Sequence, residues 1–185
     1  MSSLRDKILD IAYEEIYTNG YSATGLNTIL QKSNVAKGGL YHHFSSKKEL
    51  IIAIINERIC PNSVKKYSKL DSLKKDKLKT LLEILDSRNR DFDKGCPLGN
   101  LILELSNIDE DISKALQNCI NSWQTIFEKV ILEAIKNKEI KNISAYDSSL
   151  FIISTIQGGL LLSKLSKTDF EYKKCIKSLK IFFNL

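Results

Sequence analysis

The side chains best suited to bind nucleic acid are concentrated in one short stretch, residues 24–50. This stretch contains four lysines against a single acidic residue, Glu49, together with one tyrosine and two histidines. Lysine ammonium groups neutralise phosphates, and tyrosine and histidine side chains donate hydrogen bonds to the sugar-phosphate backbone. The local excess of cations favours DNA binding, although a lysine-rich chain with solvated surfaces would give the same charge.

The same stretch predicts two short helices joined by a tight turn. Leu26 and Ile29 fall on one helical face, and Ser33 and Asn34 then interrupt the apolar pattern. Asn tolerates the left-handed conformation, so Asn34 can reverse the chain. The second helix, expected over residues 36–44, would then be the recognition helix of a helix-turn-helix, which enters the major groove of DNA.

A capping box begins the next helix. Ser46 is expected to cap this helix and Glu49 to reach back to the cap. Lys47 and Lys48 stand in its first turn, where free N–H groups and the helix dipole also favour an anion. The pattern therefore predicts a phosphate clamp at the two lysines.

The expected DNA contacts combine these lysines with the polar face of the recognition helix. The glycine pair lets a phosphate strand come close, and Thr24 is expected to cap its helix while touching phosphate. Lys37 is the candidate for reaching a base edge, while tyrosine and histidine hold phosphates. Alternatively, the aromatic residues are ordinary surface residues of a small bundle. The expected contacts are Thr24, Lys37, Gly38, Gly39, Tyr41, His42, His43, Lys47 and Lys48.

The run KGGLYHHFSSKKEL, residues 37–50, resembles the DNA-binding domain of the TetR family, the tetracycline-repressor-like transcriptional regulators. Thr24, Ile29 and Val35 stand before this run at the spacing of the family. Residues 19–21 also resemble the family's link between its first two helices.

The sequence departs from the family pattern at Asn34, commonly Gly, and at Ala36, where many members have a capping Ser or Thr. The resemblance implies an all-α protein of about nine helices. Residues 1–46 would form the helix-turn-helix domain, 47–61 a connecting helix, and 62–185 a domain for ligand binding and dimerisation. Scarce strand-type alternation and only 2 Pro and 8 Gly also favour helices.

The later helices are predicted from the spacing of their apolar residues and from residues that end or interrupt a helix. Pro61 cannot donate to the preceding turn, so the connecting helix is expected to end or kink near Cys60. A helix over residues 78–92 should follow, then helices over residues 109–137 and 144–166.

Composition excludes several classes of protein. The 43% hydrophobic and 27% charged residues are ordinary for a globular chain and exclude extensive disorder. Cys60, Cys96, Cys119 and Cys175 are too widely spaced for a zinc site or a disulfide framework, so no metal or cofactor is expected. With no signal peptide pattern and no apolar run near the ~20 residues of a membrane helix, the protein is expected to be cytoplasmic.

A second set of residues is expected to meet a small-molecule effector. The segment GCPLGN, residues 95–100, resembles a segment at the rim of the ligand cavity in several TetR-like regulators. Tryptophan and phenylalanine are more often core residues, and the polar members of this set would equally satisfy neighbouring helices. The expected ligand contacts are Cys96, Asn100, Leu101, Glu104, Trp123, Phe127, Gln157 and Leu161.

The predicted helix over residues 144–166 and the next one, which a capping box at Thr168 and Glu171 begins, are apolar over more than one stripe. A helix of this kind is buried on two sides, which favours one face on the core and the other on a twofold partner. The alternative is one crowded intramolecular core. The expected dimer contacts are Leu150, Ile153, Gly158, Leu160, Leu165, Leu179, Phe182 and Phe183.

These expectations describe a homodimeric DNA-binding regulator, a repressor released from its operator by a small, mainly hydrophobic effector. One alternative is control by thiol modification at Cys96, because the start of a helix at Pro97 favours a thiolate. Another is control by a protein partner. A helical carrier or enzyme is a further alternative, but no nucleophile–base pairing, phosphate loop or metal spacing supports an enzyme.

Overall fold

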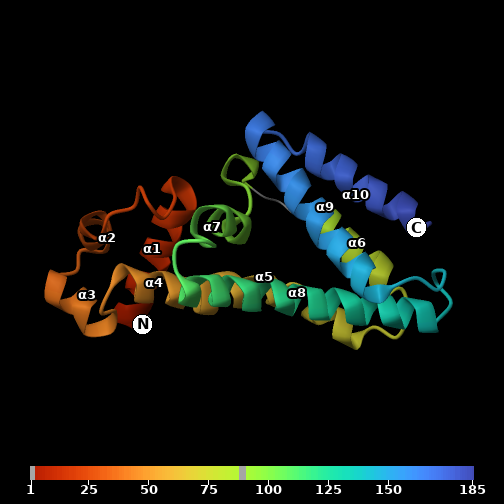
Figure 1. Cartoon of the computed structure of the whole chain (residues 1–185), viewed down its shortest axis with the longest axis horizontal. Helices are drawn as coiled ribbons and strands as arrows, with labels where there is room; N and C mark the ends of the chain where they lie inside the picture. The colour runs from red at the N-terminus through yellow and green to blue at the C-terminus, as the bar shows by residue number, and fades with distance from the viewer. Residues whose placement is uncertain (1–2, 88–90) are drawn as a thin grey trace. The chain divides into compact units, whose positions relative to one another are not determined.

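The computed structural model describes residues 3–87 and 91–185, and every regular element in these two ranges is a helix (Figure 1). Counting the continuous run α4, η1 and α5 as one helix, these ranges contain nine α-helices and two short 3₁₀ turns, which confirms the all-α prediction. The elements are α1 (Leu4–Asn19), α2 (Leu26–Ser33), α3 (Lys37–His43), α4 (Lys47–Ile54), the π-helical turn η1 (Ile55–Ile59), α5 (Cys60–Lys65), the 3₁₀ turns η2 (Ser68–Ser72) and η3 (Phe92–Lys94), α6 (Lys77–Asp86), α7 (Pro97–Leu105), α8 (Glu110–Lys136), α9 (Ala145–Ser166) and α10 (Phe170–Phe182).

The chain divides into two compact units. The first contains Met1–Asn62 together with Pro97–Cys119, and the second contains Ser63–Cys96 together with Ile120–Leu185. Helix α7 and the beginning of α8 therefore belong with the N-terminal helices, although they follow them by many residues in the chain.

Apolar residues from α1, α2, α3 and α4 form the core of the first unit. Ile8, Ile29, Leu40 and Leu50 are completely buried there. Asn34 adopts φ 51° and ψ 46°, so the predicted left-handed turn between α2 and α3 is confirmed. The tight turn sets the second helix of the helix-turn-helix at its angle to the first.

The helix that begins at Lys47 was expected to end or kink near Cys60, but it continues through Pro61 to Lys65. The π-helical turn η1 ends at Ile59, two residues before this proline, and absorbs the disturbance of the hydrogen-bond ladder. The carbonyl oxygen of Glu57, which lacks an N–H donor at Pro61, accepts a hydrogen bond from Nη1 of Arg58 at 3.3 Å. This side-chain donor compensates for the missing backbone donor.

In the second unit, α9 and α10 lie side by side (Figure 1) and approach closely at Gly159. A Cβ atom at Gly159 would lie 3.2 Å from Cα of Tyr172 and from Sγ of Cys175, so a larger residue would push the helices apart. The hydroxyl of Tyr172 donates to the carbonyl oxygen of Leu85 at 2.9 Å and ties α10 to α6.

Helix α6 is shorter than expected. It ends at Asp86, whereas the sequence pattern predicted a helix through residue 92. Residues 88–90 of the predicted helix lie outside the described part of the chain, and Phe92 begins the separate turn η3.

Helix α9 is long and apolar enough, by length and composition, to cross a membrane, with a mean hydropathy of 1.3. This finding differs from the expectation that no apolar run approaches that length. The core helix of a soluble protein passes the same test, and 44% of the apolar window is buried inside the protein. Its buried Ser148 and Ser149 donate to backbone carbonyls one turn earlier, as in an ordinary packed helix. The length and composition of α9 are therefore only weak evidence that it spans a membrane.

Candidate nucleic-acid interface and effector site

The recognition helix α3 is anchored by two apolar residues and presents polar residues outward. Leu40 and Phe44 are 0% and 1% exposed. Lys37, Tyr41 and His42 are exposed, and the Lys37 ammonium lies 5.8 Å from the centre of the Tyr41 ring. The helix begins at Lys37, and its N-cap residue Ala36 provides no side-chain cap, as the sequence indicated. The expected DNA-facing side chains of α3 therefore lie together on its outer surface, with His43 half-buried beside His42.

The two glycines of α3 have different surroundings. A Cβ atom at Gly38 would meet nothing within 4 Å, so this backbone is open on the outer side of the helix. A Cβ atom at Gly39 would lie 3.0 Å from Cγ1 of Val35, so Gly39 allows close packing across the turn. Gly38 leaves room for a phosphate strand. At Gly39, by contrast, the close contact with Val35 within the protein itself explains why a glycine is needed.

Thr24 does not cap α2, so the prediction of a capping role is wrong. The N-cap residue of α2 is Gly25, which has no side chain. Thr24 is 2% exposed, and its hydroxyl donates to the carbonyl oxygen of Gly20 at 2.7 Å. Since the hydroxyl is buried and engaged, Thr24 stabilises the turn between α1 and α2.

The capping box at α4 is confirmed in its main contact. The hydroxyl of Ser46 accepts a hydrogen bond from the backbone N–H of Glu49 at 3.1 Å. The carboxylate of Glu49 reaches back to the N–H of Ser45, at 2.6 Å, one residue before the expected partner. The helix start is therefore fixed from both sides.

Lys47 is held within the first unit. Its ammonium donates to the carbonyl oxygen of Tyr21 at 2.5 Å and lies 4.1 Å from the centre of the Tyr21 ring. Burial lowers the pKa of Lys47 below its ordinary value, and the nearby Glu104 carboxylate partly offsets this effect. Lys47 thus ties α4 to the α1–α2 turn, a role that its position in the sequence did not reveal.

Lys48 is paired with two carboxylates at the beginning of α8. Its ammonium lies 2.7 Å from Oδ2 of Asp109 and 2.7 Å from Oδ2 of Asp111. Hydrogen bonds to Asp109 and Asp111 raise the pKa of Lys48 above its ordinary value, and the bond from Lys48 lowers the pKa of Asp109. In the predicted phosphate clamp, Lys48 is therefore already paired with carboxylates of the protein itself.

Glu104 of α7, expected to contact a ligand, binds the α1–α2 turn. Its carboxylate accepts from the backbone N–H groups of Tyr21 at 2.9 Å and Ser22 at 2.6 Å. Burial raises the pKa of Glu104, but hydrogen bonds from Ser22 and Tyr21 and the charge of Lys47 outweigh it, so the pKa is lowered overall. The Glu104 carboxylate thus binds backbone N–H groups of the α1–α2 turn, and the Lys47 ammonium binds a backbone carbonyl oxygen of the same turn.

Ion pairs also join α1 to the η1 turn. The Arg5 guanidinium makes two 2.6 Å hydrogen bonds to the carboxylate of Glu57. Arg58 pairs with Asp6 at 2.8 Å and with Asp10 at 2.6 Å. The spacing of the two aspartates on one face of α1 was the only sequence sign of this network.

The comparisons with known proteins agree with this architecture. Residues 8–54 match the family described as bacterial regulatory proteins, tetR family, and residues 76–179 match the tetracyclin repressor-like C-terminal domain. The chain belongs to the TetR family of transcriptional regulators.

Relatives of the chain include regulators from several bacteria. It is 34% identical to an uncharacterized HTH-type transcriptional regulator in the lacX 3′ region of Lactococcus lactis subsp. lactis, over 90% of this chain and 86% of the relative. It is 24% identical to the HTH-type transcriptional repressor DhaR of Mycobacterium sp. (strain GP1), over 89% of this chain and 84% of the relative. A TetR transcriptional regulator from Chloroflexus aurantiacus J-10-FL has the same fold, with a TM-score of 0.86, 20% identity, and coverage of 98% and 94% of the two chains.

The residues expected to contact an effector are divided between the two units of this TetR-family chain. Asn100, Leu101 and Glu104 belong to the first unit, and the other five to the second. Leu101 is buried and Asn100 half-buried.

Within the second unit, most of the expected ligand residues are buried against one another or their neighbours. Trp123 donates its indole N–H to the Ser63 hydroxyl at 2.7 Å, and Phe127 is completely buried. Cys96 is 6% exposed, and the Gln157 amide donates to its sulfur at 3.5 Å. Leu161, by contrast, is 54% exposed on α9.

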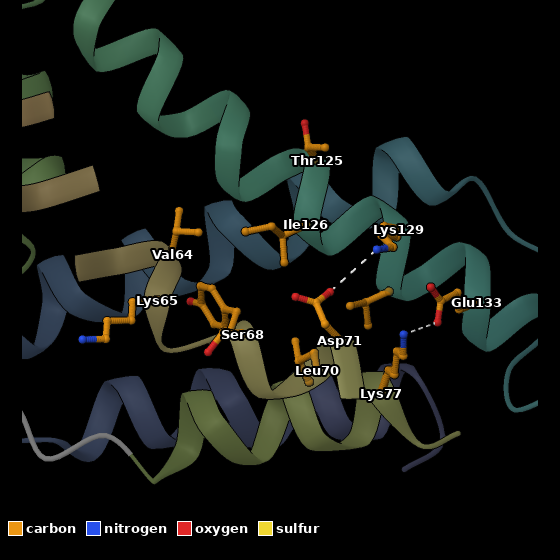
Figure 2. A pocket seen from close by; sticks show the side chains of 12 residues that line it. Val64, Lys65, Ser68, Leu70, Asp71, Lys77, Thr125, Ile126, Lys129 and Glu133 are labelled. Atoms are coloured by element: carbon orange, nitrogen blue, oxygen red, sulfur yellow. Dashed lines mark ion pairs between the residues drawn. The ribbon is translucent and has the colours of Figure 1, made fainter. Parts of the chain in front are cut away.

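A pocket of about 320 Å³ lies between η2 and α8 in the second unit (Figure 2). Leu70 and Ile126 approach it from opposite walls, and charged residues surround its mouth. None of the eight expected ligand residues lines this pocket. Much of its lining comes from residues 64–77, where lysines are spread among sparse apolar residues and no apolar helical face indicates a site.

The residues expected at a dimer interface separate into two groups. Leu165 and Phe182 are 84% and 55% exposed, Gly158 is exposed and Leu150 is half-buried. The other four are buried within the protomer itself, where their packing between α9, α10 and the neighbouring helices leaves them no surface for a partner. These buried residues are Ile153, Leu160, Leu179 and Phe183.

Proposed function

We propose that the protein is a homodimeric repressor that binds operator DNA and leaves it when a small, mainly hydrophobic effector binds. The observation that carries this proposal is the recognition helix α3, whose Lys37 and Tyr41 face outward while Leu40 and Phe44 anchor it in the core. This arrangement supports insertion of α3 into the major groove, with Lys37 near base edges and Tyr41, His42 and the exposed Gly38 backbone near phosphates.

The dimer part of the proposal rests on the exposed apolar surface of α9 and α10. Phe151 and Phe182 contact each other with ring centres 4.9 Å apart, and Leu161, Leu162 and Leu165 are each more than half exposed. Large exposed apolar patches mark interaction surfaces in soluble proteins. A twofold dimer built on this surface would place two recognition helices about one DNA turn (~34–36 Å) apart.

The effector part of the proposal follows from family membership and concerns the C-terminal helices. A ligand changes DNA affinity only when it binds the DNA-competent and DNA-incompetent conformations unequally. Cys96, Trp123 and Gln157 remain candidate contacts in this proposal. Control by modification of the Cys96 thiol is less favoured because the thiol is buried. Such a regulator would act in the cytoplasm, where its DNA is.

Retardation of the DNA upstream of the protein's own gene tests the proposal. The purified protein should retard this DNA and not a scrambled duplex, and the complex should contain two protomers, or a multiple of two, per operator. A panel of uncharged, anionic and cationic hydrophobic compounds should include some that release it. Monomeric protein at micromolar concentration that ignores the DNA at low salt would contradict the proposal.

A further inference from the structure

The pocket between η2 and α8 has an apolar interior. Leu70 and Val130 are each 3% exposed, and Ile126 adds a half-buried side chain from the opposite wall (Figure 2). Tyr67 also lines the pocket, and its ring is fixed at its back by an edge-to-face contact with Phe127, with ring centres 5.2 Å apart. The rigid, apolar interior favours an apolar ligand body.

The charges at the mouth of the pocket are unequally satisfied. Lys77 is buried and pairs with Glu133 at 2.5 Å, so these two charges neutralise each other at one end (Figure 2). Lys129 lies 3.7 Å from Asp71, which is longer than a hydrogen bond, and both side chains are more than 60% exposed. A ligand can separate this second pair at little cost, because exposed ion pairs contribute little.

The local field at the mouth favours an anion over a cation. Lys65 and Lys129 line the pocket, while Asp71 is the one acidic lining residue besides the already paired Glu133. Lys66 adds a further positive charge nearby, 5.3 Å from the centre of the Tyr67 ring. An entering carboxylate would meet the Lys129 ammonium of α8, whereas the Lys65 side chain extends away from the pocket and adds only a more distant positive charge (Figure 2).

We propose that this pocket binds a small amphipathic anion, with its apolar body on Leu70, Ile126 and Val130 and its acidic group at Lys129. The volume of about 320 Å³ is at the lower end of small-molecule sites, which suits a single aromatic ring or a short chain. The inference rests on the proposed function for one point, that the occupant is the effector of the repressor. The effector would then bind in this pocket and not at Cys96, Trp123 and Gln157, which do not line it.

Methyl NMR on protein labelled at isoleucine, leucine and valine tests this site directly. The probes are 4-phenylbutyrate, 4-phenylbutanol and 4-phenylbutylamine, which share an apolar body and differ in charge. The acid should shift the methyl signals of Val64, Leu70, Ile126 and Val130, with a Kd on the order of 1 mM, as expected for a ligand of this size. The methyl signal of Ile29, in the other unit, should move less than these four, because only the methyl groups of the pocket contact the probe.

Two variants and a matched control locate the binding contacts. Lys129→Gln should weaken binding of the acid about twofold to fivefold without affecting the alcohol, because it removes one exposed ion pair. Ile126→Trp should fill the pocket and abolish binding of all probes. Lys136→Gln removes the same charge from the exposed end of α8, outside the pocket, and should leave all affinities unchanged.

Binding of the amine as tightly as the acid, an absence of shifts at the four methyl groups, or equal effects of Lys129→Gln and Lys136→Gln would overturn the inference. Retardation of upstream DNA by the same samples without probe is recorded in parallel. Failure of that retardation contradicts the proposed function, whereas failure of the methyl shifts contradicts the pocket, so the two results are distinguishable. The acid should lower DNA affinity in the wild-type protein and not in Ile126→Trp, and binding without this effect would overturn the effector assignment.

Discussion

The Nζ atom of Lys48, in the first turn of α4, lies 2.7 Å from Oδ2 of Asp109, immediately before α8. Asp111 approaches the same ammonium equally closely. The N-terminus of α4 is also where a DNA phosphate is expected to bind. We therefore expect the two carboxylates and a phosphate to compete for one cation, so that the junction of α7 and α8 would reduce the affinity of the interface for DNA.

The double substitution Asp109→Asn with Asp111→Asn should increase DNA affinity. Asn at position 109 keeps the capacity to cap α8, where Asp109 now accepts from the N–H groups of Asp111 and Ile112. Release of Lys48 should raise DNA affinity by up to roughly fivefold per protomer, as expected for a partly exposed pair. Fluorescence anisotropy with labelled upstream DNA at fixed salt measures the change.

The matched control is Glu110→Gln, which removes a neighbouring exposed charge that is not paired with Lys48. It corrects for the general gain in affinity when any acidic residue near DNA is neutralised. An increase for the double variant no larger than for Glu110→Gln would show that the Lys48 pairs do not compete with DNA.

Lys47 and Lys48 should respond differently to replacement by alanine. Lys48→Ala should weaken DNA binding and reduce the slope of log K against log salt by about 0.9 per lost phosphate contact, with little change in stability. Lys47→Ala should in addition lower the free energy of unfolding by about 1 kcal/mol, because its ammonium binds the Tyr21 carbonyl oxygen. Salt titrations of DNA binding and urea unfolding separate the two effects. Equal unfolding curves for both variants would contradict the structural role of Lys47.

Glu104→Gln should destabilise the protein at neutral pH and not in acid. A carboxylate with a lowered pKa contributes stability above its unfolded-state pKa and loses it as the pH falls through its folded-state pKa. The variant should therefore lose about 1–2 kcal/mol at pH 7, from weaker bonds to Tyr21 and Ser22, and the difference should shrink below about pH 4. Urea unfolding across pH measures this, with the exposed Glu14→Gln of α1 as control.

The sequence was sufficient for several structural features that depend on neighbouring residues. The turn at Asn34 and the cap at Ser46 follow from residue type and spacing, and the structure has both of them. The family resemblance then supplied the order of helices, which local spacing alone does not determine.

The sequence was insufficient where side chains meet across long separations. Glu104 lies more than 80 residues from the N–H groups it binds, and nothing in its helix indicates that partner. The aspartates that hold Lys48 likewise belong to a different part of the chain. Thr24 was misassigned because a threonine before a helix is usually a cap, whereas here the following Gly25 takes that position. The contacts of Glu104 and Lys48, unlike the cap, depend on tertiary packing.

Native thiol labelling should rank the four cysteines by exposure. Cys60 is half-buried and should react with iodoacetamide faster than the buried Cys96 and Cys119. Cys175 is also half-buried, but burial raises the pKa of its thiol, so it should react more slowly than Cys60. Mass spectrometry of the folded protein at pH 7 gives the order. Faster labelling of Cys96 than of Cys60 would support control by thiol modification at Cys96 instead.

Leu165→Glu should convert the dimer into monomers at micromolar concentration. Leu165 is 84% exposed at the end of α9, so the substitution leaves the core intact while placing a charge in the proposed apolar interface. Loss of a central contact commonly costs 2 kcal/mol or more, which is roughly thirtyfold in the dimer dissociation constant. Leu103→Glu is the matched control, since Leu103 is 73% exposed on α7 and has no expected place in the interface. Light scattering after size exclusion should show monomers for Leu165→Glu and dimers for wild type and Leu103→Glu. Because half-operators bind weakly, Leu165→Glu should also lose DNA retardation, and a dimeric Leu165→Glu protein would place the interface elsewhere.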